Sequence, residues 1–289
     1  MLLALAVTIS LNGLLAEAAS AADDAGDTST QALVDRALVA VGQSDRADLA
    51  WTAPDDPAAS DGLSTASGTV SVTPATSDDS LVQASSNQVQ AVTVLRDGTD
   101  TTNFSLDLPD GVRAVPRGAG FDIIAFAPGG GSITAGHIDA PWAVDAHGRS
   151  IPTRFSLDGH TLTQTIDPEG AAFPVVVDPL VTLGLANAPQ GVGFYVNLLG
   201  SQMRAIAAAA AFISSTGVAA LCAASSKIPS AVKWIIISGC AAFGAPRLGD
   251  IISFVTRAYR SGSYGFSTCY QTRVEANRPW VRTDHSNCE

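Results

Sequence analysis

The sequence predicts an α+β protein with more than one domain, in which an antiparallel β-sandwich or roll is followed by a small disulfide-bonded helical domain. Three observations carry this prediction. Short runs rich in Val, Ile, Thr and Phe, separated by turn residues, fill positions 68–182. Long runs of apolar and small residues follow within positions 190–289. All four cysteines of the chain lie in that second part.

Length and composition limit the number of domains and the classes of partner that the chain can have. The chain has 289 residues, of which 46% are hydrophobic and 15% are charged. This length allows one or two domains and a sizeable core, and the composition argues against a chain that is disordered as a whole. The formal net charge is −11. We therefore expect no nucleic acid partner, because phosphate binding needs a basic face.

The N-terminal segment has the features of a secretory signal. Positions 1–15 carry no charge, and Ala19, Ser20 and Ala21 fit the small-x-small cleavage pattern. We expect a signal peptide over 1–21 and export of the protein. No Lys or Arg precedes Arg36, so the usual basic start is absent. The alternative is a buried or interfacial N-terminal helix.

Positions 22–67 form an acidic segment rich in Ala, Asp and Ser that ends in a linker. Within it, Leu33, Val34, Leu38 and Val41 recur at helical spacing, and we expect this helix to end before Gly42. The Pro-, Asp- and Ser-rich stretch 52–68 is typical of a linker.

Positions 68–182 predict a β module. Positions 153–157 and 161–164 alternate apolar and polar residues on either side of Asp158 and Gly159, which predicts a hairpin. Many short strands without helical patterns between them favour an antiparallel sandwich or roll.

Charge is distributed unevenly along the chain. Positions 22–189 carry 7 Arg against 22 Asp and Glu, whereas positions 190–289 carry 9 Lys and Arg against 4 acidic residues. This asymmetry indicates separate modules.

The segment 162–179, LTQTIDPEGAAFPVVVDP, resembles a module of uncharacterised secreted actinobacterial proteins that share a similar "LTQTVD–GAAYPVVADP" ending. The resemblance implies an exported β module ahead of a variable C-terminal region. It implies no activity and no functional residues.

Positions 190–289 are basic and apolar. Positions 205–226 are 22 uncharged residues, which as one helix would be about 33 Å long and match a bilayer core. A second apolar run follows up to Pro246, and an amphipathic stretch covers 250–259. One interpretation is a membrane-active, bacteriocin-like helical hairpin; the other is a soluble helical core. In the first, one set of side chains faces lipid: Arg204, Lys227, Lys233, Trp234, Arg257 and Arg260.

The four cysteines allow three disulfide connectivities. We prefer the sequential pairs Cys222–Cys240 and Cys269–Cys288. With a turn near Ile228, the first pair would be offset by about 9 Å along regular helices, beyond disulfide reach. Either that turn lies later, the first helix ends before Cys222, or the pairing differs. Cys269 and Cys288 would staple a small hairpin.

The sequence contains no recognisable catalytic, cofactor or metal motif. We therefore expect a secreted, non-enzymatic protein whose C-terminal module contacts an anionic membrane or cell envelope. The runner-up is a soluble extracellular binding or structural protein. A weaker alternative is a secreted hydrolase that uses carboxylates such as Asp145 and Asp167.

Overall fold

The structure is a computed structural model. It describes residues 29–47, 50–56, 62–65, 68–76, 78–85, 87–96, 98–126, 131–183, 186–188, 191–193, 195–223, 228, 230–273 and 278–288. The predicted signal peptide 1–21 lies outside the described residues. The fold is mixed α+β and mostly antiparallel, with a disulfide-bonded C-terminal region that contains helices, as predicted.

Most of the described strands belong to two sheets. The small sheet has the order β1 (Leu63–Thr65), β2 (Gly68–Pro74), β5 (Thr101–Asp107), β11 (Thr161–Ile166), β10 (Thr153–Asp158). The large sheet has the order β18 (Val281–Arg282), β17 (Cys269–Arg273), β16 (Tyr195–Leu199), β8 (Ser132–Ile138), β13 (Leu180–Leu183), β4 (Gln88–Leu95), β12 (Val175–Val177), β9 (Ala143–Val144). Three more strands belong to the large sheet: β3 (Ser80–Ala84) pairs with β4, β7 (Gly120–Phe126) with β8, and β6 (Val112–Arg117) with β7. Strands β14 (Ala186–Ala188) and β15 (Gly191–Gly193) form a separate two-stranded sheet.

The main core lies between the two sheets. Phe104 and Leu162 from the small sheet pack in one buried cluster with Ile123, Val177 and Val181 from the large sheet. The alternation of apolar and polar residues along the strands produces this arrangement, because successive side chains point to opposite faces. The predicted hairpin is confirmed: β10 and β11 pair antiparallel, with Leu157 opposite Leu162.

The N-terminal helix covers the outer face of the large sheet. Helix α1 (Thr30–Ala40) contains Leu33, Val34 and Leu38 of the predicted apolar positions, and Val41 is its C-cap residue. Val34 and Leu38 pack on Val92 and Val176. The short helix α2 (Ser44–Ala47) follows. Part of the segment predicted to be a linker instead forms β1, which pairs with β2. These residues therefore belong to the folded sandwich.

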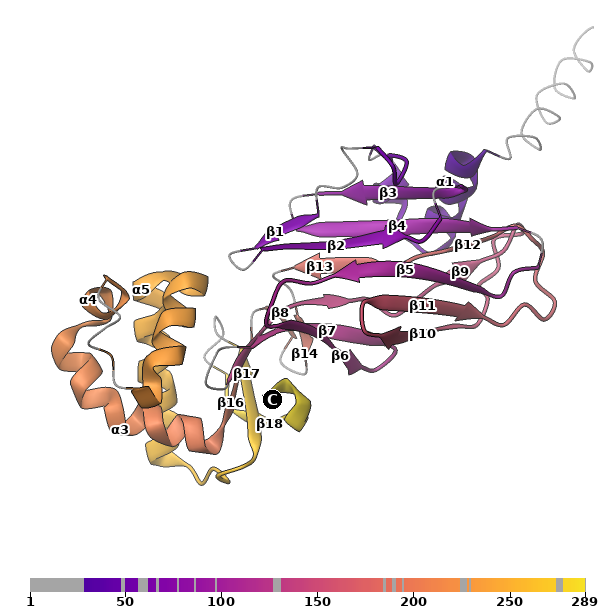
Figure 1. Ribbon diagram of the computed structural model, residues 1–289. Helices are drawn as coiled ribbons and strands as arrows, with labels where there is room; N and C mark the ends of the chain where they lie inside the picture. Colours follow the sequence, from indigo (N-terminus) through magenta and orange to yellow (C-terminus); the bar gives the residue numbers. More distant parts are fainter. Residues whose placement is uncertain are drawn as a thin grey trace, which may run out of the picture.

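In the sequence, the C-terminal helices are inserted between two strands that are neighbours in the large sheet. Strand β16 leads into α3 (Gly200–Thr216), α4 (Val218–Ala223) and α5 (Ser230–Ser261), after which the chain returns as β17 beside β16. These helices gather at one end of the molecule, and α1 lies at the other (Figure 1). Strand β16 also pairs with β8. Hydrogen bonds therefore join the predicted β module to the predicted helical module.

The single helix expected over 205–226 is wrong. Helix α3 ends at Thr216 because Gly217 takes a left-handed φ of 82°, and α4 starts after it. The later segments, expected to be separate, form one 32-residue helix, α5, which continues through Pro246. Among the described residues, no helix is both long and apolar enough to cross a bilayer.

Candidate functional site

Two disulfides hold the C-terminal part of the chain, and both join the predicted pairs. Cys222 is bonded to Cys240 and Cys269 to Cys288, with Cα–Cα distances of 5.7 and 5.9 Å. The offset expected for Cys222 does not arise, because α3 ends before it and Cys222 lies on the separate helix α4. Two disulfides indicate an oxidising environment.

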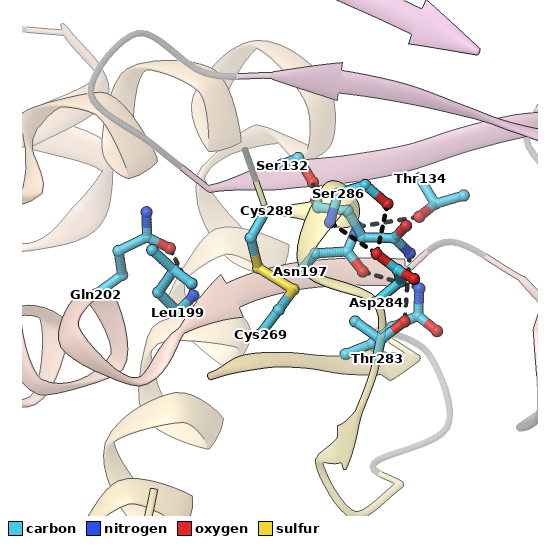
Figure 2. The surroundings of a disulfide bond; sticks show 12 residues. Ser132, Thr134, Asn197, Leu199, Gln202, Cys269, Thr283, Asp284, Ser286 and Cys288 are labelled. Atoms are coloured by element: carbon cyan, nitrogen blue, oxygen red, sulfur yellow. Dashed lines mark hydrogen bonds between the residues drawn. A yellow bond between two sulfur atoms is a disulfide. The ribbon is translucent and has the colours of Figure 1, made fainter. Parts of the chain in front are cut away.

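The Cys269–Cys288 disulfide joins β17 to the 3₁₀ helix η3 (His285–Asn287) near the end of the chain (Figure 2). Strands β17 and β18 pair as the predicted hairpin, with Tyr270 opposite Arg282. The Asp284 carboxylate accepts hydrogen bonds from the backbone N–H and the hydroxyl of Ser286 at the start of η3. The segment from β18 to Cys288 is thus held at its start by pairing with β17 and at its end by the disulfide.

A buried polar network ties this segment to the sheet. Asn197 Nδ2 donates to Ser132 Oγ at 3.1 Å and to Thr134 Oγ1 at 3.0 Å, and its Oδ1 accepts from Gln271 Nε2 at 2.8 Å. Ser132 Oγ donates to the backbone carbonyl of Asn287 (Figure 2). All five residues are buried. Full hydrogen bonding is what such buried polar groups require.

The apolar side chains of the three helices face one another. They form a second buried cluster, and strand residues of β16 and β17 complete it. Its fully buried members on the helices are Met203, Ile206, Ile213, Leu221, Ile236, Leu248 and Val255. Much of the apolar content that suggested membrane insertion is therefore core.

The predicted lipid-facing residues are only partly placed. Arg204, Lys233, Arg257 and Arg260 are exposed to solvent. Lys227 lies outside the described residues. The position of Trp234 on α5 is described, but the surroundings of its side chain are not.

A groove runs between α3 and α5, and it brings two of the predicted basic residues together. Its volume is about 600 Å³. Arg257 and Arg260 lie three residues apart on α5 and both line it, a spacing that places them on one helix face. Thr256, 7% exposed, also lines the groove, and its hydroxyl has no hydrogen-bond partner among the described residues.

The rest of the groove is built from small and aliphatic side chains. They are Ala210, Ala211, Ile213, Ser214, Gly217, Val218, Gly249, Ile252 and Ser253. Two guanidinium groups above such a surface can hold an anionic group with an apolar portion attached. Sequence reasoning identified the arginines but not the groove, because the break at Gly217 that helps to form it interrupts an otherwise uniform apolar run.

The carboxylates considered for hydrolysis have local partners. Asp145 is buried and accepts hydrogen bonds from the backbone N–H groups of His147, Arg149 and Ala172, and from the Arg149 guanidinium. Asp167 accepts from the backbone N–H of Glu169 in an exposed turn. Both sets of contacts are typical of turns. Within the described parts of the chain, no three His, Cys, Asp or Glu side chains are grouped to hold a metal ion.

The chain matches no protein-family model, no curated protein and no solved structure. The resemblance of 162–179 to secreted actinobacterial proteins stays a prediction.

Proposed function

We propose that this is a secreted, non-enzymatic protein that contacts an anionic membrane or cell envelope through its helical layer, α3 to α5. The observation that carries the proposal is the pair of exposed arginines, Arg257 and Arg260, along the groove between α3 and α5. Positions 200–261 hold six basic residues and one acidic residue, Asp250, in a chain of net charge −11. Positive charge is thus concentrated in the segment that forms the helical layer, and Arg257 and Arg260 bring two of these charges to the groove.

The contact we propose is adsorption at a lipid headgroup layer. Each Lys or Arg near an anionic membrane surface contributes about 1 kcal/mol of attraction. Phe212 on α3 and Ile237 on α5, exposed by 38% and 44%, offer apolar contacts on the same helical layer. The buried cluster of the helices favours this mode over insertion of a hairpin, because insertion would need that cluster to open. The acidic sandwich would then present the helical layer to the surface.

A second candidate is a soluble extracellular binding or structural protein. It is favoured by the same buried cluster, since helices that pack on one another and are clamped by Cys222–Cys240 need no lipid to be satisfied. Under this alternative, the groove binds a soluble anionic partner or none.

Vesicle co-sedimentation of the oxidised full chain separates the two candidates. We expect binding to phosphatidylglycerol vesicles that weakens with salt, and no binding to phosphatidylcholine vesicles. The double substitution Arg257→Gln/Arg260→Gln should weaken binding about 30-fold, as two headgroup contacts imply. The matched control, Arg113→Gln/Arg154→Gln, removes the same charge from the sandwich and should bind nearly as the parent does.

Absence of binding to anionic vesicles would contradict the proposal and leave the soluble alternative. Equal losses for both double variants would contradict the role of the groove. A dye-leakage assay on the same vesicles measures the bacteriocin-like activity: adsorption alone releases no dye, and salt-sensitive leakage supports a membrane-disrupting effector.

A further inference from the structure

The loop that joins α5 to β17, residues 262–268, carries the most exposed large apolar side chain among those that the structure describes. This side chain is Phe266, which is 68% exposed. In Figure 1 the loop forms the lower margin of the molecule, below the start of α3, and α1 lies at the opposite end. The loop contributes no residue to the groove between α3 and α5, so it is a separate feature of the surface.

Backbone hydrogen bonds hold Phe266 in this position. Its carbonyl oxygen accepts from the N–H of Ser201 at 2.9 Å, and the carbonyl oxygen of Thr268 accepts from the N–H of Gly200 at 3.1 Å. The loop thereby satisfies two amides at the start of α3 that have no partner within the helix. The N–H of Thr268 donates to the Gly265 carbonyl at 3.1 Å, which closes a turn with Phe266 inside it. The exposed ring therefore extends from a fixed backbone.

The neighbouring aromatic residue of the loop, Tyr264, is used for packing. Its ring stacks on Tyr259 of α5, with the centroids 6.2 Å apart, and meets the ring of Tyr270 of β17 edge-on at 4.8 Å. The Tyr270 hydroxyl accepts a hydrogen bond from the N–H of Gly265 at 2.8 Å. All three tyrosines belong to the apolar cluster of the helical layer or pack against it, and Phe266 does not.

The charges around the loop are positive. Arg204 lies three residues beyond Ser201 on the same face of α3, and Arg260 lies two residues before the loop begins. Both arginines are exposed, and positions 251–274 carry no acidic residue. Anionic lipid headgroups attract such charges, and an exposed aromatic ring beside them is suited to the interface below the headgroups.

The loop favours a membrane over a protein as its partner. A protein interface usually has a broad core of apolar side chains. Here the residues directly beside Phe266 are Gly265 and Ser267, so a single ring projects between small residues. Such a ring can enter a headgroup layer without carrying polar side chains with it.

We propose that Phe266 inserts into the interface of an anionic membrane while Arg204 and Arg260 bind headgroup phosphates beside it. This proposal rests on the function proposed above and deepens it, because it names the edge of the helical layer that enters the membrane. The groove between α3 and α5 would then lie at the headgroup level through Arg260, which belongs to both surfaces.

The first test is co-sedimentation of the oxidised full chain with phosphatidylglycerol vesicles. Phe266→Ala should weaken binding about tenfold, because the variant loses the transfer of the ring out of water. It should leave the dependence of binding on salt unchanged, because no charge is removed. Val39→Ala is the matched control: Val39 is 61% exposed on α1, at the other end of the molecule, and this variant should bind as the parent does.

The second test measures depth. Phe266→Trp and Val39→Trp each add one tryptophan to the four of the parent. On phosphatidylglycerol vesicles whose acyl chains carry bromine, a quencher of tryptophan emission, the emission added by Phe266→Trp should be quenched and shifted to shorter wavelength. The emission added by Val39→Trp should keep its intensity and wavelength.

The outcomes separate this proposal from the one on which it rests. No binding of the parent to these vesicles would contradict both. Binding of the parent together with unchanged binding of Phe266→Ala, or with no quenching of the emission added by Phe266→Trp, would overturn this proposal alone. The groove would then remain as the membrane contact, and Phe266 would be left for a protein partner.

Discussion

The guanidinium of Arg46 and the carboxyl of Asp178 are joined through one side chain, that of Gln90. Gln90 Oε1 accepts from Arg46 Nη1 at 3.1 Å, and Gln90 Nε2 donates to Asp178 Oδ2 at 2.9 Å. The backbone N–H of Trp142 donates to Asp178 Oδ1 at 3.3 Å. Burial raises the pKa of Asp178 to about 8, although these hydrogen bonds oppose the shift. The chain of contacts ties α2 to the outer face of β4.

The raised pKa predicts a stability that falls as the pH rises. Asp178 binds its proton more tightly in the folded state, so between about pH 4 and about pH 8 the folded protein holds up to one extra proton. The free energy of unfolding should then decrease by at most about 1.4 kcal/mol per pH unit from this group. Urea unfolding at several pH values should show this slope in the parent and lose it in Asp178→Asn. Equal slopes in the two proteins would contradict the prediction.

Asp145 should have the opposite effect on the pH dependence of stability: its contribution should be lost as the pH falls. Burial disfavours its charged form, but the backbone N–H groups and the guanidinium of Arg149 outweigh burial and lower its pKa to about 2. Its contribution to stability should be complete above about pH 4 and be lost as the pH falls through about 2. Asp145→Asn should lower the free energy of unfolding at neutral pH by about 2 kcal/mol. Denaturant unfolding measures this, and Asp167→Asn, in an exposed turn, should change little.

The Cys269–Cys288 disulfide should stabilise the end of the chain locally as well as globally. Its sequence separation is 19, and closing a loop of this length contributes about 3 kcal/mol in the chain-entropy description. Cys269→Ala/Cys288→Ala should lose about that much, and exchange of the backbone amides of residues 287 and 288 should accelerate. Cys222→Ala/Cys240→Ala removes a disulfide of similar separation and should leave those amides protected. Equal exchange in the two variants would argue against a local role.

Two glycines of the helical layer should respond oppositely to alanine. A Cβ atom at Gly200 would collide with the Gly265 carbonyl oxygen, whereas at Gly249 the nearest atom is Val218 Cγ2 at 3.7 Å. Gly200→Ala should therefore lower the free energy of unfolding by about 1–3 kcal/mol. Gly249→Ala lies inside α5 and should raise it by about 0.5–1 kcal/mol. Thermal and urea unfolding compare the pair directly, and a stable Gly200→Ala protein would refute the close contact.

Local sequence patterns predicted much of this structure. The alternation around Asp158 and Gly159 specified the β10–β11 hairpin, because a strand with one buried face repeats every two residues. The apolar spacing before Gly42 specified α1 in the same way. Sequential pairing of the cysteines was the preferred of three connectivities, and both preferred pairs are confirmed.

Contacts between segments that are far apart in the sequence have no such local sequence pattern. The pairing of β16 with β8 depends on Asn197 meeting Ser132 and Thr134, which are more than sixty positions earlier. Arg46 is buried although it lies in an acidic, polar segment, because Gln83 and Gln90 from the sheet accept its hydrogen bonds. A small cavity beside Asp122 is lined by β7 and by the last residues of the chain, which come together only in the folded protein. The partners of such side chains are determined by the tertiary fold and not by the neighbouring sequence.

The register of β16 and β17 places Leu199 directly opposite Cys269. Paired residues in an antiparallel ladder lie about 5 Å apart, so the chain leaves the sheet and re-enters it at almost the same point. In topological terms, all of α3, α4 and α5 is a single very long hairpin loop. Such a loop is an interchangeable insert: related chains could lengthen, shorten or replace it while the strands on either side keep their partners.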